Sequence, residues 1–172
     1  MMQRVQKIPD FVALRTEALE SWLPHLYGNR FASIMAIKGI PGEAESKGQP
    51  PFFGPDSEAL ERALVALDWG SNNWCGVALD LPQRDILSNS DLRLLIETID
   101  PQALLALDEK AIVALQDGYG TELMPRIPQP GIKTKILGRA LVFVDGFEAA
   151  LSSEEDKRRA WRELKALKLV KY

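Results

Sequence analysis

Acidic side chains in predicted loops are the residues of this chain best suited to acid–base chemistry. Glu43 and Glu45 lie in a stretch rich in Gly and Pro, and Asp80 and Asp145 each follow a short apolar run. A positioned carboxylate can move a proton or orient a water molecule, so each of the four is a candidate catalytic acid. Carboxylates in loops are more often simply solvated, and two acids without a partner do not define a mechanism.

The other side chains considered for chemistry are two further acids, the only histidine and the only cysteine. Asp85 and Glu148 follow the same apolar runs and could face the same loops. The only histidine, His25, is expected near the surface at the end of a helix, and the only cysteine, Cys75, inside a buried strand. One His and one Cys cannot supply the ligands of a typical zinc or iron–sulfur site. We therefore expect no metal and no cofactor. A single cysteine also cannot form an internal disulfide, which suits a reducing compartment, so we expect a cytoplasmic location.

Hydrophobic periodicity divides the chain into alternating helices and strands. Apolar residues at a spacing near 3.6 predict helices, and short runs that are apolar at every position predict strands buried on both faces. Ser152 or Ser153, with an acid three residues later, forms a capping box for the last helix. The predicted helices span about 10–27, 56–67, 90–99, 109–116 and 153–167, and the predicted strands 32–37, 74–79 and 103–107, with one or two more in 135–144.

This order predicts one α/β domain over residues 1–172, with a mostly parallel central sheet and helices on both faces. Ligands of such sheets bind at the carboxyl ends of the strands. The loops that follow Ile37, Leu79, Leu107 and Val144 are therefore the predicted place for a functional site.

Four segments, in order, carry a resemblance to a known family. The loop after the first strand reads KGIPGEAESKGQPPFFG and is followed by a Leu-rich helix, residues 101–107 read PQALLAL, and the chain continues through EAAL at 148–151 to a Lys- and Trp-containing helix at 157–167. Together they resemble the thermostable, iron–sulfur class of the uracil-DNA glycosylase superfamily (family 4-like) over about residues 31–168. The resemblance implies that family's α/β fold and a cleft for a DNA base.

The departures from the family's motifs fall on its chemical positions. The resemblance places an acid at Gly39, a uracil-reading Asn at Val77 and a base-stabilising His at Gly146, and all three are missing. The four cysteines that would hold the cluster are missing as well. Cutting the bond between uracil and deoxyribose requires groups that handle water and stabilise the departing base. We therefore expect a family member without efficient uracil excision.

What remains of the family's pattern is a framework for a cleft the size of a base or nucleotide. The resemblance implies that Phe52 stacks on the base, although Phe52 and Phe53 could equally pin the loop to the core. The residues predicted to line the cleft are Gly39, Ile40, Pro41, Gly42, Phe52, Val77, Gly146 and Phe147.

Charge gives weaker guidance about partners. The net charge is −3, which counts mildly against a dedicated nucleic-acid binder, but Arg158, Arg159 and Arg162 lie in a basic segment. They are possible contacts for DNA phosphates, although an ordinary solvated helix with acids at its start looks the same. No apolar run is long enough to cross a bilayer, so a membrane is not an expected partner.

Two alternatives to an inactive glycosylase-like protein stay open. One is a divergent DNA glycosylase or hydrolase whose acid has moved to Glu43, Glu45, Asp80 or Asp145. The other is a non-enzymatic module that binds a nucleotide, a nucleic acid or another protein.

Overall fold

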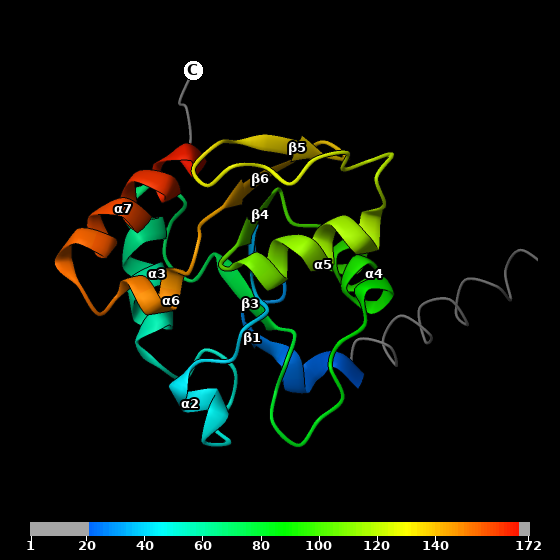
Figure 1. Cartoon of the computed structure of the whole chain (residues 1–172), viewed down its shortest axis with the longest axis horizontal. Coiled ribbons are helices and arrows are strands. Elements are labelled where there is room, and N and C mark those ends of the chain that lie inside the picture. Colours follow the sequence, from blue (N-terminus) through cyan, green and yellow to red (C-terminus); the bar gives the residue numbers. More distant parts are fainter. Residues whose placement is uncertain (1–20, 169–172) are drawn as a thin grey trace, which may run out of the picture.

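The computed structural model describes residues 21–168, which form a six-stranded sheet between two layers of helices (Figure 1). The strand order is β1-β3-β2-β4-β6-β5, in which the four central strands are parallel and the two edge strands antiparallel to their neighbours. The strands are β1 (Leu26–Gly28), β2 (Ile34–Lys38), β3 (Trp74–Ala78), β4 (Ala103–Ala106), β5 (Thr134–Ile136) and β6 (Arg139–Phe143). The predicted mostly parallel α/β sheet is confirmed.

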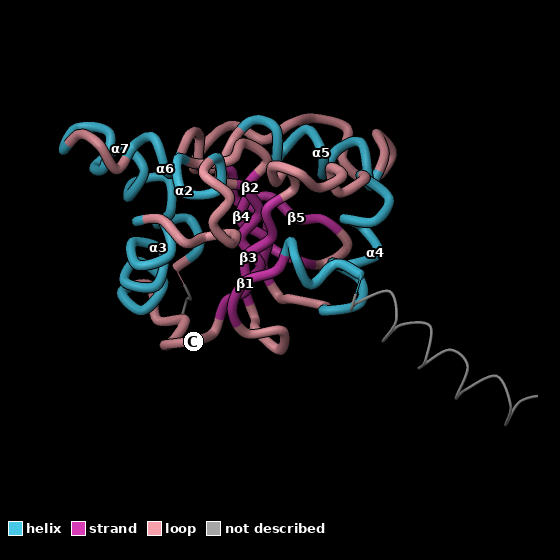
Figure 2. Tube along the Cα trace, turned by 90° about the horizontal axis from the view of Figure 1, so that it is seen from below, coloured by secondary structure: helices cyan, strands magenta, loops and turns pink. Residues whose placement is uncertain are grey.

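Helices cover both faces of this sheet, as Figure 2 shows. Residues of α4 (Asn89–Ile99) and α5 (Glu109–Tyr119) pack on one face, and residues of α3 (Pro55–Ala66), α6 (Phe147–Ala150) and α7 (Glu154–Leu164) pack on the other. Alternate side chains of each strand serve the two faces: Met35 and Ile37 of β2 point to the first core, Ile34 and Ala36 to the second. This alternation explains why the central strands are apolar at every position.

One predicted helix start is confirmed, and another is shifted. Ser153 accepts a hydrogen bond from the backbone N–H of Asp156, which confirms the predicted start of α7. The helix predicted from about residue 56 is α3, whose N-cap is Gly54; Asp56 lies in its first turn, where it is buried. Asp56 is therefore available for another partner. Two short helices, α2 (Glu43–Ser46) and α6, lie where no helix is predicted.

The amino-terminal helix predicted for about 10–27 lies largely outside the described residues, and its described end is different. After a short 3-10 helix, η1 (Leu23–His25), the chain forms β1 and pairs with the outer edge of β3. His25, expected at the surface, is buried, and its Nδ1 lies 2.7 Å from the carbonyl oxygen of Ala78. The helical prediction fails here because the exposed edge of β3 offers backbone partners that a helix would leave unpaired.

Among residues 21–168, no helix has the length and apolar character required to cross a membrane.

An aromatic side chain fixes the long loop between β2 and α3 to the sheet. Phe52 is fully buried, its ring centroid lies 5.6 Å from that of Trp74, and it covers the backbone of β3 at Gly76. A Cβ atom at Gly76 would lie 2.5 Å from the Phe52 ring. The absence of a side chain at position 76 is what allows the ring to pack there.

We expect Gly76→Ala to destabilise the protein by about 1–3 kcal/mol, because the methyl group would overpack against Phe52. Urea unfolding measures this change. Combining Gly76→Ala with Phe52→Leu should cost less than the sum of the two single changes, since the smaller side chain frees the space. Strict additivity of the two free energies would contradict this packing.

Candidate functional site

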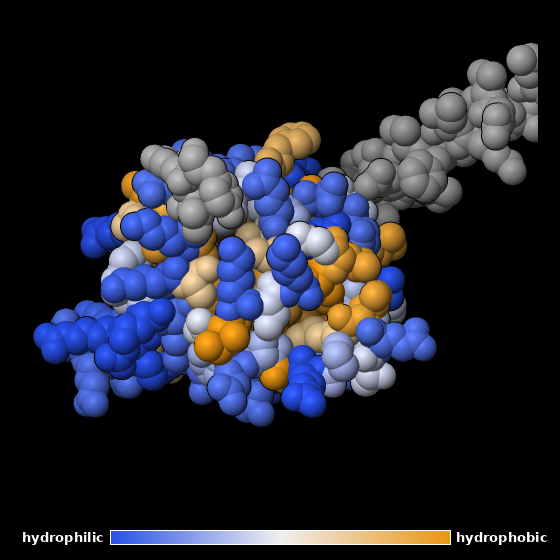
Figure 3. All heavy atoms as spheres, turned by 90° about the horizontal axis from the view of Figure 1, so that it is seen from above, coloured by the Kyte–Doolittle hydropathy of each residue, from blue (hydrophilic) through white to orange (hydrophobic). Residues whose placement is uncertain are grey.

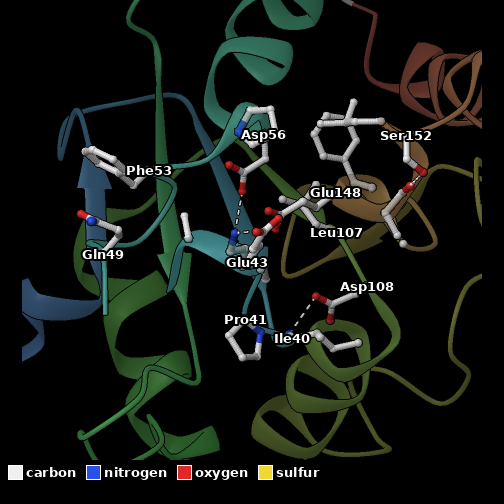
Figure 4. A pocket seen from close by; sticks show the side chains of 18 of the residues that line it. Ile40, Pro41, Glu43, Gln49, Phe53, Asp56, Leu107, Asp108, Glu148 and Ser152 are labelled. Atoms are coloured by element: carbon white, nitrogen blue, oxygen red, sulfur yellow. Dashed lines mark hydrogen bonds and ion pairs between the residues drawn. The ribbon is translucent and has the colours of Figure 1, made fainter. Parts of the chain in front are cut away.

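A cleft of about 700 Å³ opens at the carboxyl ends of the parallel strands, where the sequence places it. It lies between the loop after β2, the loop after β4 and helix α6 (Figure 4). Its apolar wall includes Ile40, Pro41, Phe53, Phe147 and Leu151. A volume of this size is typical of sites for small organic ligands.

The floor of the cleft holds a lysine among three carboxylates. Lys38, the last residue of β2, is almost completely buried. Its Nζ lies 2.5 Å from Glu45, 2.6 Å from Asp56 and 2.9 Å from Glu148. The acids come from α2, α3 and α6, and Figure 4 shows the side chains of Asp56 and Glu148 close together. We call these four residues the Lys38 cluster.

The electrostatics of this cluster keep the lysine charged. Burial alone would lower the pKa of Lys38, but hydrogen bonds to Asp56, Glu45 and Glu148 outweigh it and raise that pKa above its ordinary value. A protonated amine has no free electron pair, so Lys38 is an electrostatic anchor and not a nucleophile.

Glu45 and Glu148 respond to the cluster in opposite directions. Burial opposes ionisation of Glu45, but hydrogen bonds from Lys38 and from the backbone N–H of Phe52 lower its pKa. Burial raises the pKa of Glu148; Lys38 offsets this only in part, and the charges of Asp56 and Glu45 raise it further. Glu148 thus accepts a proton more readily than Glu45.

A further acid, Asp108, is buried outside the cluster and holds the turn that borders the cleft. It caps α5 through the N–H of Ala111 and accepts hydrogen bonds from the backbone N–H groups of Gly39 and Ile40, at 2.9 and 3.0 Å. A Cβ at Gly39 would lie 2.8 Å from the nitrogen of Ala111, so only glycine allows this approach. The turn at residues 39–42 has no carboxylate of its own. Asp108, which follows the neighbouring parallel strand β4, supplies one.

The structure brings together five of the residues predicted for the cleft. Ile40, Pro41, Gly42, Gly146 and Phe147 all line it. A Cβ at Gly42 would lie 2.1 Å from Oε1 of Glu148, so a side chain there would displace that carboxylate.

Three other predicted cleft residues lie elsewhere. Phe52 and Val77 are fully buried in the core, so neither side chain is open to a ligand. Gly39 faces a second, smaller cavity of about 470 Å³ beside α5. The exposed aromatic side chain in the wall of the cleft is that of the next residue, Phe53, which is 63% exposed.

The four candidate acids are also separated. Glu43 lines the cleft but is exposed and paired with Lys47, whereas Glu45 is sealed inside the Lys38 cluster. Asp80 lines the second cavity. Asp145 is exposed, and its backbone contacts Glu163 and Arg159 of α7.

The basic segment forms the outer face of α7. Arg158 and Arg162 are exposed, while Arg159 is bound to Glu163 and to the carbonyl oxygen of Asp145. The strongly hydrophilic lobe at the lower left of Figure 3 is this helix. The first turn of α7 is acidic: the arginines are preceded by Glu154, Glu155 and Asp156.

Sequence reasoning missed Lys38, Asp56 and Asp108 as site residues. Lys38 carried a signal, since a lysine that continues a fully buried strand must find a counter-charge. Asp108 follows a strand and precedes a helix, the pattern of an N-cap, but its contacts with Gly39 and Ile40 have no local signature. Asp56 begins the helix predicted at 56–67, a position that carries no signal of an ion pair with Lys38.

Among residues 21–168, no group of His, Cys, Asp and Glu side chains is arranged to hold a metal ion. Comparison with known proteins gives no further guide: no protein-family model matches the chain, and no curated protein is significantly similar to it.

Removing the ammonium should expose the dependence of the fold on this cluster. We expect Lys38→Met to destabilise the protein by about 3–5 kcal/mol at pH 8, because three carboxylates would remain close together without a counter-charge. This loss of unfolding free energy should become smaller toward pH 5. In the variant, repulsion raises the pKa values of the carboxyl groups in the folded state above their values in the unfolded state, so protonation favours the folded state.

Denaturant unfolding at both pH values measures this effect. Lys47→Met is the matched control: it removes an exposed lysine paired with Glu43 and should cost no more than about 0.5 kcal/mol. Equal losses for the two variants would contradict the role of Lys38.

Proposed function

We propose that the chain is a uracil-DNA glycosylase-like protein without efficient uracil excision, whose cleft binds a ligand the size of a nucleobase or nucleotide. The observation that carries the proposal is the cleft itself. It is built from the turn at residues 40–42 and from Gly146 and Phe147, two segments that the resemblance assigns to base binding. A cytoplasmic location is part of the same proposal.

The chemistry of the lining supports binding over excision. The chain's one histidine, His25, is buried against Ala78, and the acid of the turn at residues 39–42 is Asp108, which is occupied by backbone N–H groups. Neither group is free to act on a departing base.

Phe53 is the aromatic residue that we propose to contact the ligand in place of Phe52. Its ring is exposed in the cleft wall, and a base stacked on an aromatic ring gains about 1–3 kcal/mol.

A second candidate function rests on Glu148. A half-buried carboxyl group with a raised pKa, lining a cleft, has the properties of a general acid or base. It favours an N-glycosylase or related hydrolase in which the relocated acid is Glu148 and not Glu43, Glu45, Asp80 or Asp145.

A base-release assay separates the two candidates. We expect uracil release from single- and double-stranded DNA to be at least about a thousandfold slower than with an authentic glycosylase, because general acid–base groups alone contribute about 10²–10⁴ to the rate. Comparable release would contradict the first candidate. Release of another base from a panel of damaged DNAs, abolished by Glu148→Ala, would establish the second.

Binding to the cleft is tested by calorimetric titration of free nucleobases, nucleosides and mononucleotides. We expect at least one to bind, and Phe53→Ala to weaken it about tenfold through the loss of stacking. Phe31→Ala is the matched control, since Phe31 is 94% exposed and precedes β2 at the opposite edge of the sheet. No binding by any member of the panel, or equal weakening by both variants, would contradict the proposal.

A further inference from the structure

Glu148 is the one acid of the Lys38 cluster whose side chain is partly exposed, and it lines the cleft. Glu45 also accepts the N–H groups of Gly42 and Phe52, and Asp56 that of Ser57. For Glu148, the hydrogen bond found within residues 21–168 is the one from Lys38 to Oε2. Its side chain is 24% exposed, against 0% for the other two. Its Oε1 has no hydrogen bond to any residue within 21–168 and therefore keeps the capacity to accept one from a bound molecule.

The charges around the cleft disfavour an anion. Four carboxylates line it, on Glu43, Asp56, Asp108 and Glu148, against the two ammonium groups of Lys38 and Lys47. Both lysines are already paired, Lys38 within its cluster and Lys47 with Glu43. A phosphate group entering the cleft would meet surplus negative charge in a site of reduced dielectric, where repulsion is strong.

The walls favour a flat, apolar body. Ile40, Phe147 and Leu151 line the cleft, and Phe53 and Pro41 add a ring face each. A heterocycle with or without a pentose fits within about 700 Å³.

We propose that Glu148 is the ligand-recognising residue of this cleft, and that the ligand is an unphosphorylated heterocycle with an N–H group, such as a nucleobase or nucleoside, and not a nucleotide or DNA. Oε1 of Glu148 accepts the ligand's N–H while Lys38 holds Oε2. This inference rests on the proposed function, since it specifies the ligand of the same cleft.

The groups that face Glu148 also set the pH response of binding. Lys38 of β2 favours the ionised carboxylate, whereas burial and the charges of Asp56 in α3 and Glu45 in α2 disfavour it. Protonation of Glu148 leaves only an uncharged acceptor, which binds an N–H group more weakly, so nucleoside affinity should fall as the pH drops through its raised pKa. Glu148→Gln should abolish that dependence.

The test compares each nucleoside with its 5′-monophosphate, using uridine, cytidine and adenosine in calorimetric titrations. We expect the wild-type protein to bind a nucleoside at least about tenfold more tightly than its monophosphate, because of charge repulsion. Glu148→Gln should weaken nucleoside binding about tenfold, as expected for loss of a charged acceptor. It should also reduce the difference in affinity between the nucleoside and its monophosphate.

Glu109→Gln is the matched control, because Glu109 is exposed, lies outside the cleft and loses the same charge. It should leave both affinities unchanged, and thermal melting should show both variants folded. Tighter or equal binding of the monophosphate, or an unchanged preference in Glu148→Gln, would overturn this inference and leave the proposed function standing. Binding of neither ligand class would overturn the proposed function itself.

Discussion

The rest of the site depends on the need to neutralise one buried ammonium group. Lys38 ends a central strand inside the protein, and a charge there is tolerated only with partners. Those partners come from α2, α3 and α6, which lie 7, 18 and 110 residues further along the chain. The cluster therefore ties the first loop, the next helix and the last third of the chain to one point, and the cleft opens where they meet.

Close packing around glycine completes this arrangement. Gly42 leaves room for the Glu148 carboxylate, Gly39 lets its turn reach α5, and Gly76 accepts the ring of Phe52. The long loop is thus fixed by its backbone and by a buried aromatic residue. Phe53 remains in the cleft wall while Phe52 serves the core, although the two are adjacent.

The architecture could be predicted from the sequence more fully than the site. Apolar runs at 32–37, 74–79 and 103–107 identify three of the four parallel strands, because burial on both faces leaves few polar positions. The carboxyl edge follows from that topology, and Ile40 to Gly42, Gly146 and Phe147 line the cleft there. The Lys38 cluster could not be predicted, since its pairings depend on contacts between distant segments. Strand β1 was missed because it forms only through pairing with β3.

Nuclear Overhauser contacts between a nucleoside and methyl groups of the protein test most directly whether the cleft beside Lys38 holds a base-sized ligand. Contacts from the base protons to Ile40 and to the alanine methyls of Ala44 and Ala149, all in the lining, are the predicted result. Contacts confined to Ile86 and Val113 in the second cavity, or none at saturating ligand, would contradict it.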